Sequence, residues 1–297
     1  MQSTRVPSAS EFETRGITLL DQLPSTARRH SVTVHGVELG YSLIEPVGPR
    51  RGTALFVAGY TSSYDTFNCL LEPLAEHGYR VLGLSQRGQP HSSGPDDEAG
   101  YRLEQLGHDI HGFLDAVEID DPVHLVGHSF GGVVAQEAVL QNASRFASVT
   151  MWNSGPRAMS EGEVAYEALQ RGGAFELWTI DRLRAGADPH ASRNVIEQYY
   201  FDRLMGTNEH QLVAGAAILR DQVDRTLELS ETGVRFLVSH GANDDAWPVD
   251  WQRDMALALK ADYVVLANAG HSSHGDRPNL AADVLAAFWS DSSSATS

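Results

Sequence analysis

The chain has 297 residues, of which 42% are hydrophobic and 21% charged, with 22 basic against 39 acidic residues and a net charge of −17. This apolar content is sufficient for a large folded core and argues against intrinsic disorder. The acidic surplus argues against binding to nucleic acid or to an anionic membrane surface, because like charges repel.

Nothing in the sequence indicates export or membrane insertion. The N-terminus lacks the apolar segment of a secretory signal, and no run approaches the roughly 18 apolar residues of a membrane span. Cys69 is the only cysteine, which excludes an intramolecular disulfide and a metal site of several cysteines. We therefore expect a cytoplasmic protein.

Short apolar runs alternate with helical patterns along most of the chain. Residues 31–34 and 37–44 flank His35-Gly36, which predicts a hairpin. Continuous apolar runs, typical of strands buried on both faces, span 54–58, 80–85, 123–127, 147–152, 234–240 and 263–267. Apolar residues at a spacing of three to four predict helices at 67–78, 103–118, 131–143, 249–260 and 279–289. This alternation predicts an α/β fold with a doubly wound, mostly parallel sheet.

One long stretch contains helical patterns only. Residues 155–231 lie between two predicted strands and are too long for a simple crossover. We expect an inserted helical cap at the carboxyl edge of the sheet, where open α/β sheets bind ligands. The predicted organisation is an N-terminal extension at 1–30, a core formed by 31–154 and 232–290, and the cap at 155–231.

The segment Gly127-His128-Ser129-Phe130-Gly131 fits the pattern G-x-S-x-G. It follows a predicted strand and opens a predicted helix, as a nucleophile elbow requires. Glycines relieve crowding at such a turn, and a helix N-terminus favours a developing negative charge. An ordinary strand–helix turn with a capping serine is the alternative.

Candidate partners for this serine follow the last two predicted strands. Asp244 and Asp245 come after residues 234–240, and His271 comes after residues 263–267. A serine hydroxyl needs a base, and the base needs an acid to orient it. The order Ser, Asp, His along the chain is the order known for α/β hydrolases.

These motifs together make residues 31–290 resemble the α/β-hydrolase superfamily, in its cap-bearing subgroup of serine hydrolases. The segments that correspond to family patterns are Gly241, Asp244 and Pro248 for G-x-x-D…P, and Gly270, His271 and Pro278 for G-H…P. Residues 80–95 resemble the segment that reads D-x-R-G-x-G-x-S in many members. Residues 59–67 and 85–95 also resemble a group of actinobacterial α/β hydrolases.

The resemblance implies a catalytic triad of Ser129, Asp244 and His271. Asp244 is preferred over Asp245 because it keeps the family's spacing to its flanking glycine and proline. His274 is a weaker candidate for the base, because it lacks the preceding Ala-Gly turn. His128, beside the candidate nucleophile, is expected to be a hydrogen-bonding neighbour.

The resemblance also implies an oxyanion hole, made of the backbone N–H groups of Tyr60 and Phe130. Two nearby positions depart from the family pattern: Ala58 replaces a common histidine, and Ser85 replaces a common aspartate. Both positions usually organise loops, so we expect altered loop packing rather than loss of activity.

Four aromatic residues are candidates for a substrate pocket, namely Trp152, Trp178, Tyr200 and Trp247. Aromatic residues at helical spacing are often core residues, which is the alternative for each of them. A pocket lined by such residues favours a fairly large apolar substrate. No helical H-E-x-x-H spacing occurs, so we expect neither a metal nor any other cofactor.

The predicted function is hydrolysis of an ester, lactone or thioester through an acyl-enzyme, with a small molecule as the only expected partner. The same triad serves C–C bond hydrolysis, perhydrolysis, and acyl transfer or cyclisation, so these stay open. A non-catalytic ligand-binding receptor on the same fold is a further alternative. Serine at position 129 argues against epoxide hydrolysis and dehalogenation, because those relatives use aspartate there. The sequence does not determine the oligomeric state.

Overall fold

A computed structural model describes residues 22–290 of the chain. Most of the predicted N-terminal extension, 1–30, lies outside the described residues, and so do residues 291–297. The described strands are β1 (Arg28–Val34), β2 (Val37–Ile44), β3 (Gly52–Val57), β4 (Tyr79–Leu84), β5 (Val123–His128), β6 (Phe146–Trp152), β7 (Phe236–Gly241) and β8 (Asp262–Leu266). They form one sheet in the order β1-β2-β4-β3-β5-β6-β7-β8. The hairpin strands β1 and β2 pair antiparallel with each other, and β2 with β4, whereas the remaining pairs are parallel.

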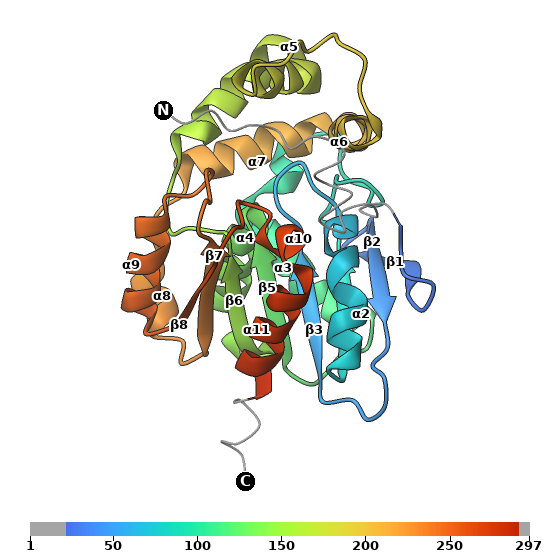
Figure 1. Cartoon of the computed structure of the whole chain (residues 1–297), viewed down its shortest axis with the longest axis vertical. Coiled ribbons are helices and arrows are strands. Elements are labelled where there is room, and N and C mark those ends of the chain that lie inside the picture. Colours follow the sequence, from blue (N-terminus) through green and yellow to red (C-terminus); the bar gives the residue numbers. More distant parts are fainter. Residues whose placement is uncertain (1–21, 291–297) are drawn as a thin grey trace.

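Helices cover both faces of the sheet (Figure 1), which confirms the predicted doubly wound α/β fold. The flanking helices are α2 (Asn68–Glu76) and α11 (Pro278–Ser290) on one face, and α3 (Leu103–Ala116), α4 (Phe130–Gln141), α8 (Thr226–Ser230) and α9 (Val249–Leu259) on the other. Short helical turns are η1 (Tyr64–Phe67), η2 (Glu98–Tyr101), η3 (Ala143–Arg145) and α10 (Ser273–Asp276). Within residues 22–290, no helix combines the length and the apolar character needed to cross a membrane.

Strand β3 shows why its sequence is a continuous apolar run. Leu55 and Val57 join the hydrophobic cluster beneath α3 and α4, whereas Ala54 and Phe56 join the cluster beneath α2 and α11. Successive side chains of a strand point to opposite faces, so a strand covered on both sides has no polar face.

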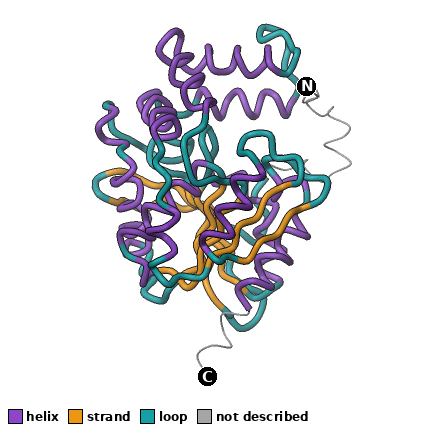
Figure 2. Tube along the Cα trace, turned by 90° about the vertical axis from the view of Figure 1, so that its left-hand side faces the viewer, coloured by secondary structure: helices purple, strands orange, loops and turns teal. Residues whose placement is uncertain are grey.

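Three helices between β6 and β7 lie above the sheet, at the ends of its parallel strands (Figures 1 and 2). They are α5 (Ser160–Arg184), α6 (Val195–Met205) and α7 (Glu209–Asp221). Helix α5 is broken at Gly172-Gly173, where Gly173 has a φ of +63°. Asn194 and Glu197 form a reciprocal capping box that fixes the start of α6.

These three helices enclose an apolar cluster of their own, which includes Trp178, Leu204 and Leu212. Two hydrogen bonds tie them to the loop after β3. The Tyr60 hydroxyl donates to the Leu212 carbonyl at 2.7 Å, and Arg203 Nε donates to the Thr61 carbonyl at 2.8 Å. The fourth inserted helix, α8, instead packs beside the sheet, where Leu229 joins the cluster that contains α4 and α9.

Candidate active site

Ser129 lies at the sharp turn between β5 and α4. Its backbone has φ 54° and ψ −122°, a conformation that costs a non-glycine residue roughly 1–3 kcal/mol and is maintained only by its surroundings. Those surroundings require glycine at position 131, because a Cβ there would lie 2.1 Å from the Val57 carbonyl oxygen. The predicted strand–turn–helix setting is therefore present, and the close packing of α4 on β3 accounts for the second glycine of the motif.

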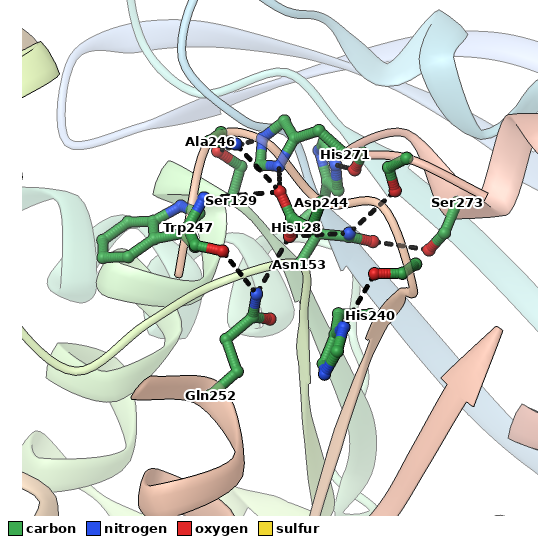
Figure 3. Close-up of polar contacts among 12 residues, drawn as sticks. His128, Ser129, Asn153, His240, Asp244, Ala246, Trp247, Gln252, His271 and Ser273 are labelled. Atoms are coloured by element: carbon green, nitrogen blue, oxygen red, sulfur yellow. Dashed lines mark hydrogen bonds and ion pairs between the residues drawn. The ribbon is translucent and has the colours of Figure 1, made fainter. Parts of the chain in front are cut away.

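The structure brings Ser129, His271 and Asp244 together at the carboxyl ends of β5, β8 and β7 (Figure 3). The Ser129 Oγ lies 3.0 Å from His271 Nε2, and His271 Nδ1 lies 2.9 Å from Asp244 Oδ1. A carboxylate can only accept, so Nδ1 carries the proton and Nε2 is left to accept from the serine hydroxyl. Asp245, the alternative acid, is exposed, whereas the Asp244 side chain has 0% of its surface exposed.

Asp244 is held by five hydrogen-bond donors. Oδ1 accepts from His271 and from the backbone N–H groups of Ala246 (3.1 Å) and Trp247 (3.3 Å). Oδ2 accepts from Asn153 Nδ2 and from Gln252 Nε2, each at 2.9 Å. Burial alone raises the pKa of Asp244, but the hydrogen bond and charge of His271, with the two amides, lower it below its usual value. The carboxylate therefore stays ionised and can stabilise a charged imidazole.

Asn153 and Gln252 are site residues that the sequence analysis missed. Asn153 follows β6 directly, with a φ of +48°, and its side chain also donates to the Gly270 carbonyl and accepts from the Ser273 hydroxyl. Its position after a strand that ends at the site is a signal that sequence reasoning could have used. Gln252 lies one turn inside α9, fully buried, and also donates to the Trp247 carbonyl, but nothing in the sequence distinguishes it from an ordinary helical glutamine.

Two buried histidines flank His271. His128 Nε2 donates to the His271 carbonyl at 3.0 Å, which makes it the hydrogen-bonding neighbour expected from the sequence. Burial, followed by the charges of His274 and His271, lowers the pKa of His128 well below its usual value. His274 lies 3.2 Å from the Thr66 hydroxyl, and burial followed by the charge of His271 lowers its pKa to about 3. Both imidazoles are therefore neutral at physiological pH.

The predicted oxyanion donors lie on two segments that meet at the serine. Phe130 is the first residue of α4, and Tyr60 follows Gly59 in the loop after β3. A Cβ at Gly59 would lie 3.1 Å from Ser129 Cβ, so this loop passes directly against the elbow. Within residues 22–290, neither the Tyr60 nor the Phe130 amide donates a hydrogen bond to another group. Both N–H groups are thus available to a ligand, although their role stays a prediction.

The four predicted pocket residues lie in different surroundings. Trp152 and Trp247 have 1% and 0% of their surface exposed and belong to the clusters on opposite faces of the sheet. Both rings are part of the hydrophobic core and present no surface to a ligand. Trp178 is packed inside the helical cluster above the sheet, against Phe201. Tyr200 is only partly buried, at the edge of the same cluster.

Tyr200 lies on α6, where its ring packs against Arg203 and Tyr199. Burial raises the pKa of its hydroxyl, the charge of Arg203 opposes this, and Asp276 and Cys69 add to the increase. Asp276 and Cys69 belong to α10 and α2, so groups of the core as well as of the inserted helices act on this hydroxyl. Its assignment to a substrate pocket stays a prediction.

At Ser85, which departs from the family pattern, the hydroxyl accepts from the Tyr64 N–H at 2.9 Å and so organises the neighbouring loop. Among the side chains of residues 22–290, no three histidine, cysteine, aspartate or glutamate groups converge as metal ligands would.

Comparison with known proteins assigns the family. Residues 54–278 match the family model for the alpha/beta hydrolase fold. A 2-hydroxy-6-oxononadienedioate/2-hydroxy-6-oxononatrienedioate hydrolase of Dechloromonas aromatica is 30% identical over 73% of this chain and 80% of its own length. A 3-oxoadipate enol-lactonase of Acinetobacter baylyi is 22% identical over 87% of this chain and 97% of its own. The crystal structure of the enol-lactonase from Burkholderia xenovorans matches with a TM-score of 0.74 at 22% identity, over 88% of this chain and 100% of that one. The chain belongs to the alpha/beta hydrolase family.

Proposed function

We propose that the protein is a serine hydrolase that cleaves an ester, lactone or thioester bond in a fairly large apolar substrate. The observation that carries this proposal is the unbroken hydrogen-bonded chain from the Ser129 hydroxyl through His271 to the buried carboxylate of Asp244, with distances of 3.0 and 2.9 Å. The relative named as an enol-lactonase supports it, because a lactone is a cyclic ester.

In the proposed reaction, Ser129 Oγ attacks the carbonyl carbon while His271 Nε2 takes the hydroxyl proton. The N–H groups of Tyr60 and Phe130 stabilise the oxyanion, and Asp244 stabilises the imidazolium. As the intermediate collapses, the leaving group departs with the proton from His271, and an acyl-enzyme remains. Water then gives a proton to His271, attacks the acyl carbon and releases the carboxylic acid, while Ser129 recovers its proton.

The inserted segment at 155–231 is proposed to act as a cap that selects substrates. Its helices α5, α6 and α7 lie above the strand ends that hold the triad (Figure 1), and the Tyr60 hydroxyl ties α7 to the predicted oxyanion loop. Helices without a sheet of their own are held by packing, so such a cap can open and close.

The test is Ser129→Ala, with Ser144→Ala as the matched control, since Ser144 is exposed on the short turn η3. We expect Ser129→Ala to lose hydrolysis of a short-chain nitrophenyl ester by a factor on the order of 10⁶, and to lose labelling by a fluorophosphonate. The control should keep both. A Ser129→Ala variant that retains several per cent of activity would refute the assignment of the nucleophile.

The same assay addresses the alternatives. Labelling at Ser129 without ester hydrolysis would support Ser129 as the nucleophile and would favour C–C bond hydrolysis, perhydrolysis or acyl transfer as the reaction. Absence of both in the wild-type protein would favour a ligand-binding receptor on this fold.

A further inference from the structure

Two glutamines hold the peptide groups of the loop that contains the predicted oxyanion donor Tyr60. Gln86 Nε2 donates to the Ala58 carbonyl and Gln89 Nε2 donates to the Gly59 carbonyl, each at 2.7 Å. The glutamines are also joined to each other, because the Gln86 N–H donates to Gln89 Oε1 at 2.8 Å. Consecutive carbonyls of one loop are thus held by side chains of the loop that follows β4.

This arrangement is built into the interior. Gln89 has 0% and Gln86 4% of its surface exposed. Arg87, between them, forms a two-pronged ion pair with the buried Asp109, with N–O distances of 2.5 and 2.6 Å. Gly88 supplies the left-handed φ of +75° that the turn requires. The two amides are therefore held in place, because the segment that carries them is anchored.

The bond from Gln89 determines where the Tyr60 N–H points. The carbonyl of Gly59 and the N–H of Tyr60 belong to the same planar peptide group and face opposite ways. A donor that fixes the carbonyl therefore fixes the direction of the N–H as well. Hydrogen bonding at the oxygen also polarises the peptide group, which strengthens its N–H as a donor. The bond from Gln86 acts one peptide earlier and orients the Gly59 N–H instead.

We propose that Gln89 is a positioning residue for the oxyanion hole, aiming the Tyr60 N–H at the negative oxygen that forms when Ser129 attacks. This inference rests on the proposed function, since a positioned donor needs an oxyanion to stabilise. Glycine at position 59 allows the donor loop to lie against the elbow, and Gln89 keeps this unusually free residue from rotating its carbonyl.

The experiment compares Gln89→Met with the matched control Gln86→Met. Each removes one buried amide donor from the same loop, and Gln89→Met also removes the acceptor of the Gln86 N–H. For a short-chain nitrophenyl ester, we expect Gln89→Met to lower kcat about tenfold with little change in KM. Complete removal of an oxyanion donor costs about 10²–10³, and loss of its orientation should cost less. Gln86→Met should lower kcat no more than about twofold, and Gln89→Met should lose more thermal stability than Gln86→Met, because it also leaves the buried Gln86 N–H without its acceptor.

A second readout isolates the oxyanion. An aryl trifluoromethyl ketone binds by addition of Ser129 Oγ to its carbonyl carbon, with the hydroxyl proton passing to His271 and the negative charge to the ketone oxygen. Its inhibition constant should rise about tenfold in Gln89→Met and stay unchanged in Gln86→Met. A residue that only supports the fold would not shift affinity for this analogue in parallel with kcat while leaving KM alone. Should Gln89→Met not fold, Gln89→Asn keeps a buried amide and withdraws the donor by one methylene.

Equal effects of the Gln89 and Gln86 variants on kcat and on the analogue would overturn this inference and leave the proposed function intact. A wild-type protein that neither hydrolyses the ester nor reacts with a fluorophosphonate would overturn the proposed function, and the inference with it.

Discussion

Asp244→Asn removes the charge of the predicted acid and keeps its shape, which makes it the sharpest test of the triad. The amide cannot satisfy the site in either orientation. With its oxygen at the Oδ1 position, its NH₂ group faces the side-chain NH₂ groups of Asn153 and Gln252. The Asn153 amide cannot flip, because its NH₂ also donates to the Gly270 carbonyl and its Oδ1 accepts from the Ser273 hydroxyl. With its nitrogen at that position, it faces the N–H groups of Ala246 and Trp247.

Each orientation has a different consequence for activity and stability. Either way at least one buried donor loses its acceptor, which costs about 1–3 kcal/mol of unfolding free energy. The second orientation also makes His271 accept at Nδ1, so that Nε2 carries a proton and cannot act as base. In a well-studied triad of this type the same change lowers kcat by about 10⁴, equivalent to about 5.4 kcal/mol.

The measurement is kcat on a nitrophenyl ester together with urea unfolding, for Asp244→Asn and for Asp245→Asn. Asp245 is exposed, so its variant should stay within about 0.5 kcal/mol of the wild type and keep its activity. If Asp245→Asn proved the more damaging change, the acid would be Asp245 and the reasoning from the hydrogen bonds would fail.

Two further predictions concern the cap and the response to pH. Tyr200→Ala should shift substrate preference toward longer acyl chains with little loss of stability. Trp178→Ala should instead destabilise the protein by about 3–5 kcal/mol, because Trp178 is packed in the apolar cluster of α5, α6 and α7. Melting temperatures and a series of esters of increasing chain length test these expectations, and an unchanged chain-length preference in Tyr200→Ala would exclude Tyr200 from the substrate site. Burial, and after it the charge of Arg235, lowers the pKa of His124 to about 4 in the folded protein, against about 6.5 in the unfolded chain. The free energy of unfolding therefore falls as the pH drops from about 6.5 toward 4, because only the unfolded chain takes up the proton in that range. His124→Gln should therefore flatten the pH dependence of the unfolding free energy by about 1.4 kcal/mol per pH unit in that window, while His108→Gln, at an exposed position, should not; an unchanged slope in His124→Gln would contradict the assigned burial effect.

The succession of strands and helices along the chain could be predicted from the sequence, because each element depends on local periodicity. The ends of the predicted strands lie within two residues of the observed ones, except that β1 begins at Arg28, three residues before the predicted start at 31. A run such as 54–58 is recognisable because it has apolar residues for both faces of the sheet. The glycines around Ser129 likewise mark a backbone turn that few other residues could form. These features belong to short segments, and each segment carries its own pattern.

The contacts that complete the site could not be predicted in this way. Asn153 reaches Asp244 because β6 pairs with β7 in the sheet, and strand order is set by the packing of the whole core. Gln89 donates to the Gly59 carbonyl because the loop after β4 and the loop after β3 lie side by side at the same edge of the sheet. Trp152 and Trp247 are large aromatic residues of the kind that often line pockets, yet both lie in the core. The sequence alone does not show whether the side chain of a tryptophan faces a pocket or the interior. Periodicity fixes which segments bury an apolar face, whereas only the tertiary arrangement decides which polar groups from distant segments come within hydrogen-bonding distance.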